Sequence, residues 1–230
     1  MKSRSTAILF FSRTVSEEAK KKAYFSVLET RNENLASSFI QNTQQKLKNT
    51  GIPVFSILSD QQKGDSFGEK LANAIEYVFR KGFENVIAVG NDCPDLSKQQ
   101  LLEVNRALQS NDLVLGPTTK GGVYLIGINQ EAYYRDSFIK LSWESPELAS
   151  SWQKYASKAY WLRAHRDIND LEDLRRYFIS SSSDFSKKLC IILNIARNDF
   201  YGFYFYTTKI VRSLYSFFSG PFRAPPQATL

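Results

Sequence analysis

The chain has 230 residues, a length that fits one large domain or a domain of about 180 residues with an extension. Hydrophobic residues make up 43% of it and charged residues 23%, so a packed core is expected and a disordered chain is not. The net charge of +7 favours anionic partners: nucleotide phosphates, nucleic acid or lipid headgroups. Two cysteines and one histidine exclude a Cys/His zinc cluster, and a disulfide framework is not expected.

Short apolar runs alternate along the chain with segments of helical character. Helices are predicted over a polar stretch whose apolar residues run from Tyr24 to Leu47, over 68–81, and from an N-cap at Ser97 to Leu108. Strands and helices in alternation are typical of a mostly parallel sheet covered on both faces, and so of an α/β fold. Strands are predicted at residues 7–11, 53–58, 85–89, 112–115 and 123–128.

The composition changes from Lys187 onward, where apolar and aromatic residues recur at helical spacing from Leu189 to Phe218 and basic residues outnumber acidic ones. We therefore predict a domain over 1–180 and a helical C-terminal tail over 181–230. The tail has two alternatives, an amphipathic helix on an anionic membrane surface or a stripe packed on protein. No run approaches the roughly 18 apolar residues of a membrane span, so we expect a cytoplasmic protein, peripheral to the inner face of the membrane under the first alternative.

Ligands of open α/β sheets bind beyond the carboxyl ends of the strands, and here the first such loop contains Asn91 and Asp92. A carboxylate at that place can hold Mg²⁺ or Mn²⁺ against a diphosphate, whereas the alternative is an ordinary turn. The loop before the last predicted strand ends in Gly121 and Gly122, which allow close approach of a ligand to the backbone but do not form a P-loop. A plain turn is again the alternative. His165 lacks a carboxylate or serine constellation and is interpreted as structural or solvated.

An ordered set of segments resembles the TagA-like, DUF2064 family of glycosyltransferases, relatives of the nucleotide-diphospho-sugar transferases and small nucleotidyltransferases. The resemblance covers about residues 6–178. The segments that carry it are 62–71 (QKGDSFGEKL), 89–96 (VGNDCPDL), 113–117 (LVLGP), 121–127 (GGVYLIG), 138–143 and 167–174 (DINDLEDL).

This resemblance implies a GT-A, Rossmann-like sheet that binds a nucleotide with a divalent cation, Mg²⁺ or Mn²⁺, between a carboxylate and the phosphates. Asp92 matches the aspartate of the family's G-x-D-x-P loop, and Asp167 with Asn169 falls on its late acidic motif, so these are the predicted metal residues. Asp92 and Lys120 are the predicted catalytic residues. The predicted nucleotide-binding residues are Phe10, Arg13, Gly68, Glu69 and Asn91, and the predicted substrate-binding residues are Gly121, Gly122 and Trp143.

The chain also departs from the family pattern. The family's N-terminal phosphate loop loses its glycine here and keeps only basic character over 13–22. Lys120 stands in place of the acid before the double glycine, and Asn169 in place of the second aspartate of the late motif. An amide ligates a metal without charge, so metal affinity is expected to fall, and Lys120 is expected to stabilise a phosphate. The alternative is that catalysis has been lost.

Two functions therefore follow from the sequence. The first is a metal-assisted glycosyltransferase or nucleotidyltransferase whose partner is a nucleotide or nucleotide sugar. The second is a catalytically degenerate protein that keeps the fold as a binding or scaffold module, associated with a membrane surface through its tail. Nucleic-acid binding is not expected, because the sequence has no RRM, KH, helix-turn-helix or zinc-finger pattern.

Overall fold

The computed structural model describes residues 5–25, 29–155 and 159–193. The chain divides into two compact units, Met1–Leu174 and Arg175–Leu230. In the second unit, helix α8 (Asp184–Leu193) covers the beginning of the predicted tail, and the remaining tail residues, which include most of the predicted amphipathic helix, lie outside the described residues. Among the described residues, no helix has the length and apolar character needed to cross a membrane.

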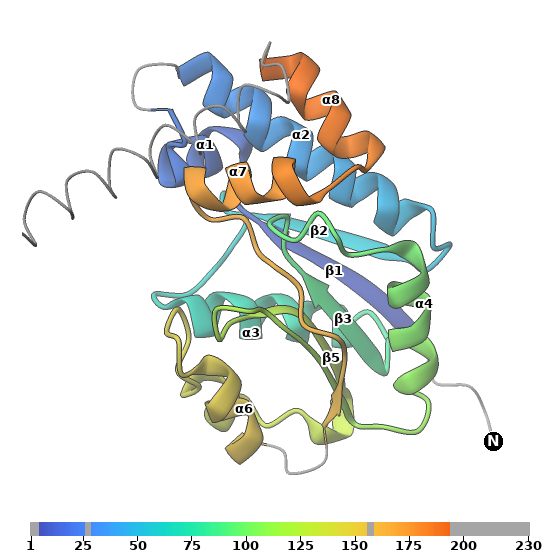
Figure 1. Ribbon diagram of the computed structural model, residues 1–230. Coiled ribbons are helices and arrows are strands. Elements are labelled where there is room, and N and C mark those ends of the chain that lie inside the picture. Colours follow the sequence, from blue (N-terminus) through green and yellow to red (C-terminus); the bar gives the residue numbers. More distant parts are fainter. Residues whose placement is uncertain (1–4, 26–28, 156–158, 194–230) are drawn as a thin grey trace, which may run out of the picture. The chain divides into compact units, whose positions relative to one another are not determined.

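A six-stranded sheet within the described residues forms the centre of the first unit (Figure 1). All five predicted strands are confirmed, and a sixth, two-residue strand was not predicted. In sheet order the strands are β2 (Val54–Leu58), β1 (Thr6–Ser12), β3 (Asn85–Val89), β5 (Val123–Asn129), β4 (Leu113–Pro117) and β6 (Tyr160–Trp161).

The sheet is mixed rather than uniformly parallel. β1 pairs in parallel with β2 and β3, and β4 with β6, whereas β5 runs antiparallel to both of its neighbours. The reversal has a simple cause, because only 118–122 separate β4 from β5. A parallel connection needs a crossover of a dozen or more residues, so strands joined this closely form an antiparallel pair.

Helices lie on both faces of the sheet, as predicted (Figure 1). Ser66 and Ser97 begin α3 and α4 through capping boxes, in which each serine and the third helical residue satisfy one another's backbone N–H groups. The helices of the first unit are α1 (Val15–Lys22), α2 (Glu29–Lys48), α3 (Phe67–Phe79), α4 (Lys98–Ala107), α5 (Arg135–Ile139) and α6 (Leu148–Tyr155), and α7 (Leu171–Ser180) begins in the first unit and continues into the second.

The two faces of the sheet carry separate cores. Ala7, Leu9 and Phe11 of β1 pack with α3, α5 and α6 on one face, whereas Ile8 and Phe10 pack with α2 and α4 on the other. Successive side chains of a strand point to opposite faces, so a fully buried strand serves both cores at once. This alternation decides which β1 side chains can reach a ligand.

Candidate functional site

The strand register brings several predicted residues to one edge of the sheet. At the carboxyl end of β3, Val89 pairs with Phe10 of β1 and with Leu125 near the start of β5. Since β5 runs antiparallel to β3, the turn that precedes it lies at the same edge as the loop that follows β3. After β6, the chain forms an isolated β-bridge between His165 and Thr118 in the β4–β5 turn. This bridge places Asp167, two residues further on, at the same edge of the sheet.

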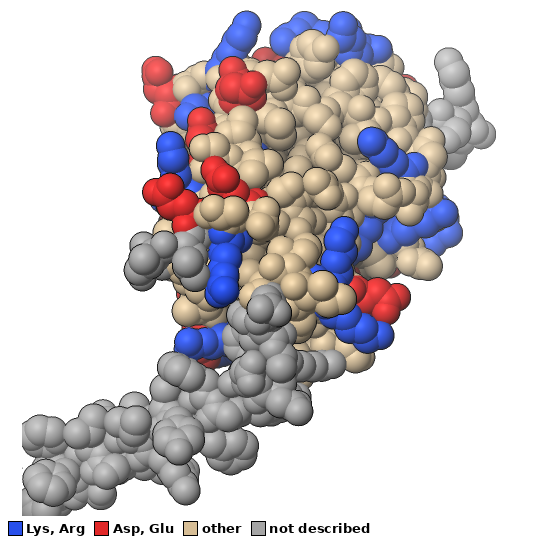
Figure 2. All heavy atoms as spheres, turned by 90° about the horizontal axis from the view of Figure 1, so that it is seen from above, with Lys and Arg blue, Asp and Glu red and all other residues tan. Residues whose placement is uncertain are grey.

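A cleft of ≈ 870 Å³ opens at this edge and is formed by residues of the first unit. It is mixed in sign, as is the molecular face in Figure 2, where Lys and Arg side chains occur in separate groups and several lie beside Asp or Glu. The charged residues lining it are Arg13, Lys21, Lys22, Lys70 and Lys120, with Glu17, Glu18, Asp65, Asp92, Glu144 and Asp167. Such a cleft suits an anionic ligand that is accompanied by a cation.

Glu18 of α1 organises one wall of the cleft. Its side chain is only 4% exposed and forms ion pairs with Arg13 at 3.1 Å and Lys22 at 3.3 Å. The amide of Asn91 donates to it at 3.2 Å, which joins α1 to the loop after β3. Burial alone would raise the pKa of Glu18, but Lys22, Asn91 and Arg13 together lower it, so the carboxylate stays charged.

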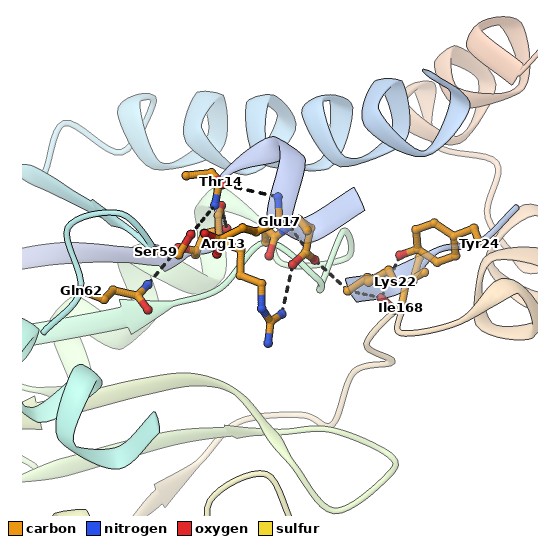
Figure 3. Close-up of polar contacts among 11 residues, drawn as sticks. Arg13, Thr14, Glu17, Lys22, Tyr24, Ser59, Gln62 and Ile168 are labelled. Atoms are coloured by element: carbon orange, nitrogen blue, oxygen red, sulfur yellow. Dashed lines mark hydrogen bonds and ion pairs between the residues drawn. The ribbon is translucent and has the colours of Figure 1, made fainter. Parts of the chain in front are cut away.

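Lys22 has a second contact in addition to its ion pair with Glu18. Its ammonium donates to the backbone oxygen of Ile168, to which the Tyr24 hydroxyl also donates at 3.2 Å (Figure 3). The Lys22 side chain is 8% exposed, so it is largely withdrawn from solvent. Figure 3 shows Arg13 extending away from α2, and its side chain is 37% exposed, so Arg13 keeps donors available to a ligand.

Asp92 and Asp167 form the acidic part of the cleft. The backbone oxygen of Asp92 accepts a hydrogen bond from Ile168 N at 2.8 Å, which holds the two segments side by side. Burial raises the pKa of Asp92, Lys22 opposes this, and the negative charges of Asp167 and Glu18 add to it. Two carboxylates placed together in partial burial repel one another unless a cation joins them.

The donor set fits a divalent ion shared with a ligand. The Oδ1 atom of Asp167 is buried and has no hydrogen-bond partner among the described residues, while its Oδ2 accepts from the Asn169 amide at 2.5 Å. Asn169 thus presents its nitrogen to Asp167 and orients that carboxylate. No group of three or more Asp, Glu, His or Cys side chains within the described ranges forms a metal cage. Two carboxylates with water and phosphate oxygens are a typical set for Mg²⁺.

Lys120 lines the cleft close to this acidic segment. Its ammonium lies 2.7 Å from Asp173 Oδ2 and 3.8 Å from Asp170 Oδ2. These ion pairs connect the β4–β5 turn to the first turn of α7. The hydrogen bond to Asp173 raises the pKa of Lys120, so the residue remains a cation.

An aromatic wall closes the cleft on the α3 side. Trp143 packs against Phe67 with a centroid distance of 5.4 Å, and its indole nitrogen donates to Phe138 O at 2.9 Å. Phe67 meets Phe11 edge to face at 5.8 Å. Because the indole nitrogen is already bonded, the wall offers apolar and π surface to a ligand.

Four of the predicted binding residues, Phe10, Gly68, Glu69 and Gly121, are not among the residues that line the cleft. Phe10 is fully buried in the core beneath α2 and α4, one position out of register, and Phe11 takes the cleft-facing place. Gly68 lies beneath Trp143, where a Cβ would stand 2.6 Å from the indole. Glu69 accepts backbone N–H bonds at the start of α3. Gly121 has a φ of +88°, and a Cβ there would lie 2.3 Å from the Pro146 oxygen.

The other predicted residues do come together around the cleft. They are Arg13, Asn91, Asp92, Lys120, Gly122, Trp143, Asp167 and Asn169. Glu18 and Lys22 were missed as individual site residues, because both lie in a polar, helical stretch whose sequence gives no sign of burial. The spacing of Arg13 and Glu18 across the start of a helix is the only signal that could have indicated their ion pair.

A family model described as "Uncharacterized protein conserved in bacteria (DUF2064)" matches residues 26–145, more than half of the chain. The chain belongs to this family. The match confirms the resemblance inferred from the ordered motifs, and a comparison with curated proteins found no match.

Among solved structures, the chain is similar to a protein of Desulfovibrio desulfuricans G20 provisionally named as a nucleotide-diphospho-sugar transferase. The two share 21% identity over 82% of this chain and 94% of that one, with a TM-score of 0.72, which shows a common fold. Weaker likenesses, at TM-scores of 0.46 and 0.45 and identities of 10% and 9%, carry no functional conclusion. They are to Mycobacterium tuberculosis H37Rv Rv0371C in complex with manganese (77% of this chain, 100% of that one) and to an Anaerococcus prevotii DSM 20548 4-diphosphocytidyl-2C-methyl-D-erythritol synthase (75% and 95%).

Proposed function

We propose that this DUF2064 protein transfers a glycosyl or nucleotidyl group from an activated nucleotide, with assistance from Mg²⁺ or Mn²⁺. One observation carries the proposal. A cleft at the carboxyl ends of β1 and β3 joins basic side chains to a carboxylate pair, Asp92 and Asp167, and the Oδ1 atom of Asp167 is buried with no partner in the described part of the chain. The fold shared with a protein provisionally named as a nucleotide-diphospho-sugar transferase and the order of the family motifs support the same function.

In this proposal Asp92 and Asp167 hold the ion, and Asn169 orients Asp167 through its amide. A bound divalent ion supplies positive charge to the phosphates and so stabilises the departing group. Asn91 and Glu18 fix the loop that carries Asp92, because the Asn91 amide is bonded to the buried carboxylate. The geometry of the pair is therefore set before a ligand arrives, which lowers the cost of reorganisation.

The basic side chains have the complementary task of holding the phosphates. Arg13 keeps free guanidinium donors beside its bond to Glu18, and a guanidinium matches phosphate geometry. In glycosyl transfer the bond between the anomeric carbon and the diphosphate oxygen breaks, and the nucleoside diphosphate leaves with the electron pair. The acceptor oxygen bonds to the anomeric carbon and loses its proton. Gly122 and Trp143 border the space available to this second substrate.

Calorimetric titration tests the proposal directly. UDP-, GDP- and CDP-sugars and the nucleoside triphosphates are titrated with and without Mn²⁺, and the matching nucleosides, which lack phosphates, serve as controls. We expect binding of at least one phosphorylated ligand and none of the nucleosides. Absence of heat with every nucleotide contradicts the proposal.

The products separate the two kinds of transfer. Release of a nucleoside diphosphate from a nucleotide sugar indicates glycosyl transfer, whereas release of pyrophosphate from a triphosphate indicates nucleotidyl transfer. Tight binding without either product, across a panel of hydroxyl acceptors, identifies the alternative binding module.

The aromatic, basic tail is part of the same proposal, as the segment that brings the protein to an anionic membrane surface with a lipid-linked acceptor. The sequence of the tail supports this membrane role, because apolar and basic residues recur at helical spacing over 189–218. Co-sedimentation of the full chain with phosphatidylserine vesicles should fall as salt is raised. Equal sedimentation with neutral vesicles would contradict electrostatic attachment.

A further inference from the structure

Lys120 is a fixed cation in the wall of the cleft. Its ion pairs with Asp173 and Asp170 direct the ammonium toward the first turn of α7, and its side chain remains 48% exposed. Unlike a solvated lysine, it does not have to lose most of its side-chain freedom when a ligand binds.

The two aspartates that pair with Lys120 are positioned by further hydrogen bonds. Asp173 Oδ2 accepts a second hydrogen bond from Asn169 N at 3.0 Å, and Asp173 N donates to Asp170 Oδ1 at 2.8 Å. Asp170 thereby caps the start of α7, so both carboxylates have a fixed place. The ammonium is positioned by a local framework that exists without any ligand.

The ammonium also has donors to spare. It carries three N–H groups, and among the described residues one of them is used by the 2.7 Å hydrogen bond to Asp173. Lys22 differs, because it is almost fully buried and bonded to both Glu18 and Ile168. Lys120 can therefore donate to an anion in the cleft that it lines, whereas Lys22 mainly compensates buried charge.

The carboxylates of the cleft give a cation beside them a role in binding an anionic ligand. Asp92 and Asp167 repel a phosphate when no metal lies between them, and the described residues contain no group of three His, Cys, Asp or Glu side chains that would form a tight metal cage. If nucleotide binding required this weakly bound ion, nucleotide affinity would be low at low metal concentration. An ammonium group beside the carboxylates supplies positive charge without a metal, so nucleotide affinity depends less on metal concentration.

We propose that the Lys120 ammonium binds the phosphates of the nucleotide, so that nucleotide binding does not require a divalent ion and only group transfer does. This inference rests on the proposed function. It makes Lys120 a ligand-contacting residue in addition to a link between the β4–β5 turn and α7.

The experiment compares nucleotide affinity in EDTA and in Mg²⁺ for the full-length protein. The variants are Lys120→Gln, Lys120→Arg and, as a lysine control outside the cleft, Lys98→Gln, with UDP, GDP and CDP as probes. The wild type should bind with affinities that differ less than about fivefold between the two conditions. Lys120→Gln should lose about tenfold or more in EDTA and regain part of this in Mg²⁺, since a hydrogen bond to a charged group contributes roughly one to two powers of ten.

The remaining outcomes distinguish a failure of this inference from a failure of the proposed function. Lys120→Arg should bind within about threefold of the wild type, and Lys98→Gln should match it. Thermal unfolding verifies that each variant is folded, and a general structural loss would lower affinity equally in EDTA and Mg²⁺, which contradicts the inference. Wild-type binding only in Mg²⁺, or unchanged binding by Lys120→Gln, overturns the inference and leaves the proposed function standing. No binding in either condition overturns both.

Discussion

The buried carboxylate of Glu18 offers a clean perturbation, because Glu18→Gln keeps the shape of the side chain and removes its charge. In the wild type this carboxylate faces Arg13, Lys22 and Asn91. The variant can still accept a hydrogen bond from Asn91. What it loses is the charge that compensates Lys22, whose side chain is 8% exposed.

The expected cost follows from that burial. Removing one partner of a buried ion pair typically destabilises a protein by roughly 3–5 kcal/mol, because the other charge stays buried without its partner. Lys22 keeps its bond to Ile168 O and the nearby charge of Asp92, so we expect the lower end, about 3 kcal/mol. Arg13 is more exposed and adds little.

Urea unfolding at pH 7 measures this cost, with Glu17→Gln on the exposed side of the same helix as the control. Lys22→Gln and the double variant complete a cycle, in which the double variant should lose less than the sum of the two single losses. Since interactions hold the pKa of Glu18 below its ordinary value, its stabilisation is present at neutral pH and is lost as the pH falls below that value. The wild-type and Glu18→Gln curves should therefore converge in acid. A loss below about 1 kcal/mol, equal to that of Glu17→Gln, would refute the reasoning.

The remaining predictions concern the metal pair and the turn. Asp92→Asn should weaken Mn²⁺ binding by at least about tenfold, measured by electron paramagnetic resonance with nucleotide present. Asp92→Asn should also raise the urea midpoint of the metal-free protein at pH 7. Burial raises the pKa of the Asp92 carboxyl, so its charged form at pH 7 destabilises the folded state. This gain in stability should vanish below the ordinary pKa of an aspartate, where the carboxyl is neutral in both the folded and the unfolded protein. Gly82→Ala and Gly121→Ala both place alanine at positive φ, which should destabilise each variant by about 1–2 kcal/mol. Gly121→Ala should lose roughly 1–3 kcal/mol in addition, because its Cβ meets the Pro146 oxygen whereas a Cβ at Gly82 meets no described atom within 4 Å. Equal urea midpoints for the two glycine variants would contradict the close contact.

The sequence predicted the strands well because each is a short apolar run bounded by polar segments. It predicted the cap at Ser97, whereas Ser66, which begins α3 through the same kind of capping box, was not predicted. The antiparallel course of β5 was available from the length of the preceding turn, but helix and strand alternation alone favours parallel strands. The two-residue strand β6 is too short to leave a periodic pattern.

The sequence predicted several loops that line the cleft, but not which side chains of β1 face it. In a strand buried on both faces, Phe10 and Phe11 are equally apolar, so hydrophobicity cannot say which side chain faces the cleft. The burial of Glu18 and the pairing of Lys120 with Asp173 depend on contacts between distant segments. Lys120 and Asp173 are 53 residues apart, and neither carries a local signal of the other. The motif order predicted which loops meet, and tertiary packing determined how their charges pair.

A crystal structure of the full chain with bound nucleotide and manganese tests the central claim most directly. The account predicts an anomalous manganese peak within bonding distance of carboxylate oxygens of Asp92 and Asp167, with the nucleotide phosphates on the other side of the ion and Lys120 beside them. Manganese bound elsewhere, or a nucleotide outside the cleft at the ends of β1 and β3, would contradict it.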